Sequence, residues 1–199
     1  MPTATPETRT VTLAGRNFLL RTLNAGDLEC LRDFFYSHTP ETIQSRYGYM
    51  IKDMTPERAA QLVCVDQTHD LALGIFEPTS HNGVLHAVGR YCLDPSGNSA
   101  EAAFVVRETM RNFGMARCLL KTLVTTAKAR GLAQLWANTA VDNQTMLHIL
   151  HKAGFKQEKH RTDGTIVMKL NLNQKSVTPK KITPRQKAVK PSRNRLDRR

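Results

Sequence analysis

The chain has 199 residues, of which 40% are hydrophobic and 23% are charged, and these proportions predict one folded domain rather than a disordered chain or two full domains. Its net charge is +12, but residues 174–199 hold ten basic residues and one acid, which leaves only +3 for residues 1–173. The longest uninterrupted apolar run has five residues, 102–106, and the N-terminal segment has neither a basic nor an apolar region, so we expect no membrane span and no signal peptide.

Four cysteines are spread along the chain without any C-x-x-C pair: Cys30, Cys64, Cys92 and Cys118. This spacing supports neither a zinc site nor a disulfide framework, so we expect no metal, reduced thiols and a cytoplasmic location. Cys118 falls inside a predicted helix, where a buried thiol is favoured over a nucleophile.

The N-terminal half of the chain predicts a sheet edge, three helices and an antiparallel meander. Short apolar runs flank the turn at 14–17, and a second pair flanks the turn at 81–83, a pattern typical of β-hairpins. Threonine before proline marks two helix starts, because the hydroxyl caps the helix and proline suits its first position. We expect strands at 9–13, 18–22, 70–77, 84–93 and 100–107, a turn at 95–98, and helices after Asn24, at Pro40 and at Pro56.

The C-terminal half alternates strands with helices. Met115, Leu119, Leu123 and Ala127 recur at helical spacing up to a stop at Gly131. We expect a strand at 132–141, a helix capped by Asp142 or Asn143 and ended by Gly154, and a closing hairpin of strands 155–160 and 165–172 around a turn at 162–164.

This order of elements predicts an α/β (α+β) fold around one mixed sheet, in a single domain that spans 9–173. Residues 1–8 are rich in Thr and Pro and are expected to be a disordered N-terminus. Residues 174–199 place three prolines among lysines and arginines and are expected to be a disordered basic tail.

The segment most informative about chemistry is 101–116, EAAFVVRETMRNFGMA, where a strand leads into an amphipathic helix. The first N–H groups of a helix are unpaired and its dipole favours negative charge, so small residues at such a junction can form a phosphate cradle. Gly114 permits close backbone approach, and Ala116 keeps the helix start open. By itself the pattern also fits a plain loop before a helix.

The wider pattern resembles the GNAT superfamily of N-acetyltransferases. Arg111-x-x-Gly114-x-Ala116 is similar to the loop that binds the acyl-CoA pyrophosphate in that family. As in that family, the loop follows an apolar strand, here containing Phe104-Val105-Val106. About thirty residues later Asn143 opens a helix that ends in Gly154-Phe155. The resemblance covers roughly residues 18–172 and implies a mixed, mostly antiparallel sheet flanked by helices.

Within the superfamily, the sequence is most similar to the acetyltransferase domain of bacterial Pat-type protein lysine acetyltransferases. The residues that suggest this are Phe34-Phe35, Thr39 to Thr42, Arg46-Tyr47, Val65-Asp66 and the strand that begins at Leu71, with Ala100-Glu101-Ala102 ahead of the loop. Such proteins often carry a large second domain, and nothing of that size fits in this sequence.

The resemblance implies acetyl-CoA as co-substrate, lying along the strand that contains Glu101. The main chain of Phe104, Val105 and Val106 would bind the pantetheine arm. Asn143 would hold that arm or act only as a helix cap, two roles that the sequence leaves open. The residues implied to hold the pyrophosphate are Asn112, Phe113, Gly114, Met115, Ala116 and Arg117, with charge added by Arg111 and Arg117.

Acetyl transfer to an amine needs a base, because an ammonium group has no lone pair with which to attack. Glu101 stands where this family places its catalytic glutamate, and strand alternation puts it on one face with Ala103, Val105 and Arg107. A solvent-exposed glutamate is the alternative. Strand N–H groups would polarise the thioester carbonyl.

Two further departures from the family pattern bear on activity. Leu150 stands where many members have a tyrosine that protonates the leaving thiolate, and His148 and His151 nearby are expected to be surface histidines. Asn112-Phe113 replaces the small and basic residues that usually precede the loop glycine, which removes a phosphate-facing charge.

Three functions stay open on the sequence. The first is acetylation of protein lysines, and the second is acetylation of a small-molecule amine. The third is a catalytically weak acyl-CoA-binding module that the tail anchors to nucleic acid or the ribosome, since its charge favours salt-dependent phosphate binding and it has no aromatic residue to stack on bases. The tail lysines are also candidate sites of autoacetylation.

Overall fold

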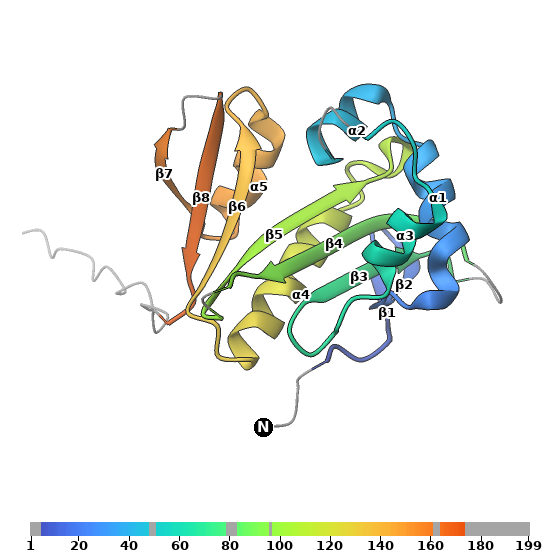
Figure 1. Cartoon of the computed structure of the whole chain (residues 1–199), viewed down its shortest axis with the longest axis horizontal. Coiled ribbons are helices and arrows are strands. Elements are labelled where there is room, and N and C mark those ends of the chain that lie inside the picture. Colours follow the sequence, from blue (N-terminus) through green and yellow to red (C-terminus); the bar gives the residue numbers. More distant parts are fainter. Residues whose placement is uncertain (1–4, 48–50, 79–82, 96, 161–163, 174–199) are drawn as a thin grey trace, which may run out of the picture.

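The computed structural model describes residues 5–47, 51–78, 83–95, 97–160 and 164–173. Within them, eight strands form one sheet in the order β1-β2-β3-β4-β5-β6-β8-β7 (Figure 1). The strands are β1 (Arg9–Leu13), β2 (Arg16–Thr22), β3 (Leu71–Phe76), β4 (Leu85–Leu93), β5 (Ser99–Val106), β6 (Gln134–Ala140), β7 (Lys156–His160) and β8 (Thr165–Asn171). Every neighbouring pair is antiparallel except β5 and β6, which are parallel.

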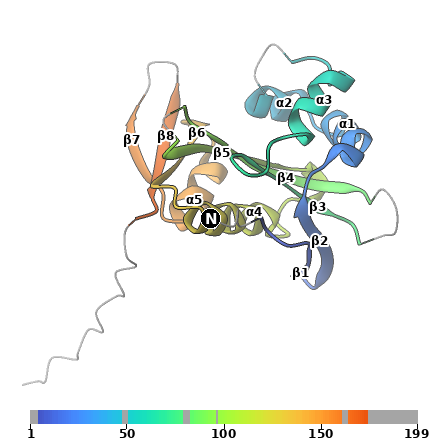
Figure 2. The ribbon, with the colours of Figure 1, turned by 60° about the horizontal axis from the view of Figure 1, so that its bottom comes forward.

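Helices cover both faces of the sheet, as the two views in Figures 1 and 2 show. One face carries α1 (Leu28–Tyr36), α2 (Pro40–Tyr47) and α3 (Pro56–Val63), and the other carries α4 (Met115–Ala129) and α5 (Gln144–Lys152). Two short 3₁₀ helices, η1 (Ala25–Asp27) and η2 (Glu108–Met110), complete the elements. The predicted mixed α/β architecture is confirmed.

Each face of the sheet has its own apolar core. Leu119, Leu123 and Ala127 of α4 pack under the sheet in the larger core, and Gly89 of β4 permits that approach, because a Cβ there would lie 3.1 Å from the Leu119 Cβ. Phe34 and Phe35 of α1 are fully buried in the smaller core on the opposite face. Successive residues of β5 point alternately into the two cores. Ala102 and Phe104 lie in the larger core, and Val105 lies in the smaller one.

The helix starts predicted at Pro40 and Pro56 are confirmed. Thr55 Oγ1 accepts a hydrogen bond from the backbone N–H of Arg58, and Pro56 opens α3. The segment after Asn24 differs from the prediction, because the capping box of Asn24 with Asp27 first closes η1 and α1 begins only at Leu28. The strand expected at 100–107 ends at Val106, and η2, which the sequence did not predict, follows it.

Several predicted features fall outside the described residues: the turn positions 81–82, 96 and 162–163, the N-terminal residues 1–4 and the basic tail 174–199. Residues 5–8 are described and adopt neither helix nor strand. In the described part of the chain, no helix is both long and apolar enough to cross a membrane.

Candidate functional site

The sheet opens between its two parallel strands. β5 and β6 pair over only three positions, from Ser99 with Gln134 to Glu101 with Trp136. Beyond them β5 continues to Val106 along β4, while β6 continues to Ala140 along β8, so the two strands diverge (Figure 1). Alternate residues of β5 from 102 to 106 therefore present their N–H and C=O groups to the opening rather than to a neighbouring strand.

The loop at the end of β5 is shaped by two residues in the left-handed region. Asn112 has φ 68° and Gly114 has φ 84°, and Gly114 is the N-cap of α4. Apart from the glycine's own chain neighbours and the backbone of its helix, no atom of the described residues lies within 4 Å of the position a Cβ would take at Gly114, so the start of α4 is open there. The first N–H groups of α4 have no acceptor within the helix, and the helix dipole adds positive potential at the same point.

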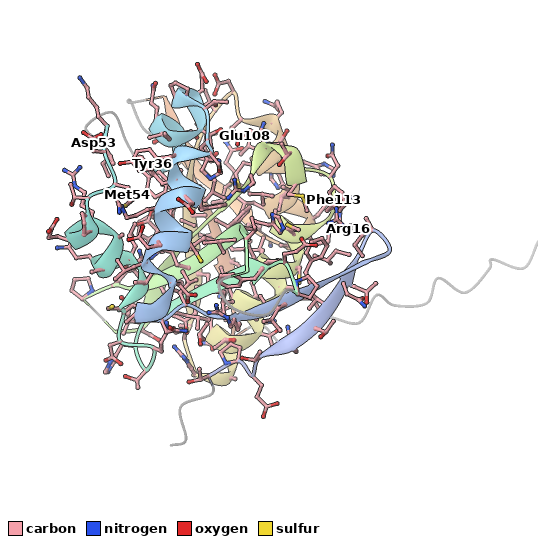
Figure 3. The ribbon with its side chains drawn as sticks, turned by 90° about the vertical axis from the view of Figure 1, so that its right-hand side faces the viewer. Arg16, Tyr36, Asp53, Met54, Glu108 and Phe113 are labelled. Carbon is pink, nitrogen blue, oxygen red and sulfur yellow. The ribbon has the colours of Figure 1, made fainter. Side chains whose placement is uncertain are left out.

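Phe113 anchors this loop to the first hairpin. Its ring meets Phe18 of β2 edge to face, with 6.4 Å between centroids. The Arg16 guanidinium lies 5.3 Å from the Phe18 centroid and 5.6 Å from that of Phe113, and it is paired with Glu77 at 3.2 Å (Figure 3). Arg16 is half exposed, so the hairpin brings a cation next to positions 112–113, where the loop has no basic residue.

Glu108, in η2, ties the loop to the segment between α1 and α2. Its carboxylate accepts hydrogen bonds from the backbone N–H of Thr39 at 3.2 Å and from His38 Nδ1 at 3.0 Å. Burial alone would raise the pKa of Glu108, but these bonds and one from Thr42 lower it to about 2. Burial lowers the pKa of His38, so a neutral ring that donates through Nδ1 fits the pair.

Arg111 belongs to the same group of contacts around Glu108, which we call the latch, and does not lie over the loop. Its Nη2 donates to Thr42 Oγ1 at 3.1 Å and lies 3.6 Å from Glu108 Oε1. Arg117, in the first turn of α4, is exposed. Of the two arginines predicted to add charge to a bound phosphate, Arg111 is turned toward α2 in this structure.

Asn143 takes one of the two roles left open by the sequence. Its Oδ1 accepts from the backbone N–H of Met146 at 3.1 Å, which caps α5 immediately after β6. The side-chain NH₂ is not needed for that cap. Asn143 is therefore a helix cap at the far side of the opening from β5.

Glu101 lies on the face of β5 that carries α1 to α3, as its alternation predicts. Its neighbours on the adjoining strands are Cys92 of β4 and Trp136 of β6. Arg46 of α2 lies close enough to interact electrostatically with Glu101, Cys92 and Arg90. Burial lowers the pKa of Arg46, and Glu101 acts against that shift, so this face places a carboxylate among partly buried guanidinium groups.

In α5, position 150 supplies no proton donor. Leu150 is fully buried in the larger core, and His148 and His151 are exposed, as predicted. Burial raises the pKa of the half-buried Cys118 thiol, which agrees with a structural thiol rather than a nucleophile. Among the residues that the structure describes, no cluster of His, Cys, Asp or Glu is arranged to hold a metal ion.

Sequence reasoning missed three contributors to this region: Arg16, the His38–Glu108 pair and Trp136. The first two join segments that are about 70 or more residues apart, so no local pattern could have shown them. Trp136 does have a local signal, because it alternates with the buried Leu135 and Ala137 along β6.

The arrangement therefore combines the edge of β5 where β6 diverges from it, an anion-attracting helix start at the end of that edge, and a carboxylate on the adjoining face. Such a site suits a long, phosphate-bearing ligand whose reacting end reaches the carboxylate.

Comparison with known proteins gives a consistent result. The sequence profile of the family described as "Acetyltransferase (GNAT) domain" matches residues 17–156. The curated protein "Acetyltransferase PA5475" of Pseudomonas aeruginosa is 27% identical over 157 residues, which cover 77% of this chain and 83% of that protein.

Solved structures share the fold. The GNAT domain of S. lividans PAT matches with a TM-score of 0.74 and 21% identity, over 82% of this chain and 96% of that one. RimL, a ribosomal L7/L12 alpha-N-protein acetyltransferase in complex with coenzyme A, matches with a TM-score of 0.66 and 15% identity, over 83% of this chain and 98% of that one.

Proposed function

Because the chain belongs to the GNAT family of acetyltransferases, we propose that it acetylates the ε-amino group of protein lysines, with Glu101 as the general base. As a family member it is an N-acetyltransferase that uses acetyl-CoA.

The opening between β5 and β6 supports the assignment of the co-substrate site. Main-chain groups of Phe104, Val105 and Val106 border the diverging edge of β5, where a pantetheine amide can pair with them as a strand would. The pyrophosphate then falls on the first N–H groups of α4, with Gly114 leaving the space clear. Arg16 is the nearest cation that the hairpin contributes to this loop.

The role of Glu101 rests on its position. It lies at the last paired position between β5 and β6, where the opening begins. A thioester carbonyl laid along the free edge of β5 would meet strand N–H groups, and an amine approaching from the α1 to α3 face would pass Glu101. This observation carries the proposal.

The reaction follows from these positions. Glu101 takes a proton from the lysine ammonium, directly or through water. The freed nitrogen attacks the thioester carbonyl carbon, and a C–N bond forms. As the tetrahedral intermediate collapses, the C–S bond breaks and the nitrogen gives its second proton to water. Because the buried Leu150 cannot give a proton, the leaving thiolate takes its proton from water.

The test compares Glu101→Gln with the native protein. We expect a loss of kcat of about 10²- to 10⁴-fold with the acetyl-CoA Kd unchanged, because glutamine keeps the shape and loses the base. The acid limb of the kcat/KM profile should disappear in the variant. Equal turnover near pH 7 would remove Glu101 from the role.

Acceptor class is tested separately. Lysine-containing proteins and peptides should be acetylated with higher kcat/KM than free polyamines or amino acids at matched amine concentration. The reverse order would favour a small-molecule acetyltransferase. Binding of acetyl-CoA without transfer to any amine would favour a ligand-binding module.

A further inference from the structure

A hollow of about 590 Å³ lies beside the proposed catalytic face. It is lined by Asp94, Ser99, Gln134, Trp136, Glu158, Val167 and Lys169. Ser99 pairs with Gln134, and Trp136 with Lys169, so the hollow spans β5, β6 and β8 on the same face as Glu101. None of the described helices covers this part of the sheet. The helices α1 to α3 lie over the other end of this face, and α5 packs on the opposite face (Figures 1 and 2).

The lining of the hollow suits a cationic chain. Trp136 Nε1 donates to Asp94 Oδ2 at 2.9 Å, and Ser99 Oγ donates to the same oxygen. These bonds fix the indole, whose face attracts ammonium and guanidinium groups. Glu158 and Lys169 form an ion pair at 2.7 Å, so the two carboxylates and one ammonium of the lining leave a net charge of −1 in a chain of net charge +12.

A basic segment of this same chain starts at the rim of the hollow. Asn171 pairs with Gln134, and the N–H of Leu172 donates to Ala133 O at 2.8 Å, so β8 ends beside the strand that lines the hollow. Residues 174–199 follow directly and carry ten basic side chains against one acid. Lys175 stands four residues after Asn171 and so reaches up to about 14 Å from it, while Lys180 and Lys181 reach up to about 30 Å.

We propose that the segment 174–199 docks in this hollow within its own chain, its lysine and arginine side chains meeting Asp94, Glu158 and the face of Trp136. The tether supplies an effective concentration in the millimolar range, so weak contacts suffice. The docked segment lies two residues along β5 from Glu101, about 7 Å. It therefore competes with an outside lysine for the same face, a consequence that rests on the proposed function, whereas the docking itself does not.

Docking is tested on the full chain with a carbodiimide, which joins a carboxylate to a lysine amine in contact with it as an amide, with loss of water to the reagent. Peptide mapping should find amides that join Asp94 or Glu158 to Lys175, Lys180 or Lys181 in the monomer. Their yield should fall several-fold between about 50 mM and 500 mM salt, because partly exposed ion pairs are screened. The Glu158–Lys169 amide is the internal positive control.

Matched variants locate the contact. Glu158→Gln should remove its own tail crosslinks and lower the total tail yield, while Glu29→Gln, which neutralises an exposed carboxylate of α1, should change nothing. Mixing isotope-labelled and unlabelled chains separates contacts within one chain from those between chains. Tail crosslinks spread evenly over surface carboxylates, or found only between chains, would overturn the proposal.

Competition is measured with the tail variant Lys175→Gln, Lys180→Gln, Lys181→Gln. The KM for a lysine peptide should fall several-fold at low salt and converge with the native value at high salt, with the acetyl-CoA Kd unchanged. An unchanged KM would show that the segment does not compete for the acceptor face. Crosslinks in a protein that acetylates no acceptor would keep the docking and refute the proposed function, and acetylation without crosslinks would do the opposite.

Discussion

Replacing Glu108 by Gln should loosen the latch between the α1–α2 segment and the co-substrate loop. The carboxylate holds Thr39 N–H, His38 and Arg111 together. Glutamine has the same shape but no charge, so the charge-assisted bonds become neutral ones. We expect a less stable fold and weaker binding of acetyl-CoA, since η2 leads directly into the loop.

The magnitude follows from the pKa of Glu108, which is lowered from 4.5 to about 2. At about 1.4 kcal/mol per unit, this shift corresponds to an upper limit of about 3 kcal/mol at pH 7. The Glu108 side chain is 23% exposed and is coupled to His38, so solvent screening reduces the effect to about 1–2 kcal/mol. For a domain of this size, that corresponds to a drop in Tm of about 2–8 °C.

The lowered pKa of Glu108 also determines how its contribution to stability changes with pH. Because the folded state binds its proton at Glu108 less readily than the unfolded state does, the contribution is complete above about pH 5 and is lost as the pH falls toward 2. Urea denaturation of the native protein and Glu108→Gln should therefore show a difference at pH 7 that falls below about half at pH 3. Glu29→Gln, at an exposed site, is the control. A difference under about 0.5 kcal/mol at pH 7, or one independent of pH, would refute the latch.

Three further changes test other parts of the site. Asn143→Ala should cost about 1 kcal/mol through loss of the α5 cap, and Asn143→Ser should recover it; acetyl-CoA affinity that Asn143→Ser fails to recover would show a contact beyond the cap. Arg16→Gln should raise the acetyl-CoA Kd several-fold at low salt and little at high salt. A Kd equal to that of the native protein at both salt concentrations would show that Arg16 does not contribute to the site. Leu150→Tyr should cost about 1–3 kcal/mol without raising kcat, because position 150 faces the core; faster turnover would contradict that placement.

Local patterns in the sequence predicted most of the fold. Period-two and helical apolar spacing located every long element. Residue type alone indicated Thr55 as a cap and left Asp142 or Asn143 for α5, and the structure selects Asn143. The observed ends of elements differ from the predicted ones where side chains compete with the backbone for hydrogen bonds. Asn24 and Asp27 close a 3₁₀ turn before α1, and Glu108 opens η2 where the strand pattern ends.

The candidate site was only partly accessible to such reasoning. Gly114 and Glu101 carry motif and alternation signals, so their placement could be predicted. The contact of Arg16 with Phe113 could not, because a hairpin turn and a loop 97 positions later meet only through the sheet. Arg111 was expected over the loop from its motif position, but Thr42 and Glu108 offer it partners from elements that the motif does not include.

The central claim is that the start of α4 cradles the pyrophosphate of acetyl-CoA, and titration calorimetry of acetyl-CoA into the full chain tests it most directly. Free CoA and the variant Gly114→Trp are the controls, since a side chain at position 114 would project into the open space there and strain its φ of 84°. The account predicts micromolar binding of acetyl-CoA and of CoA, both lost in the variant while the variant's far-UV spectrum is retained. No binding at millimolar acetyl-CoA, or binding that Gly114→Trp leaves unchanged, would contradict it.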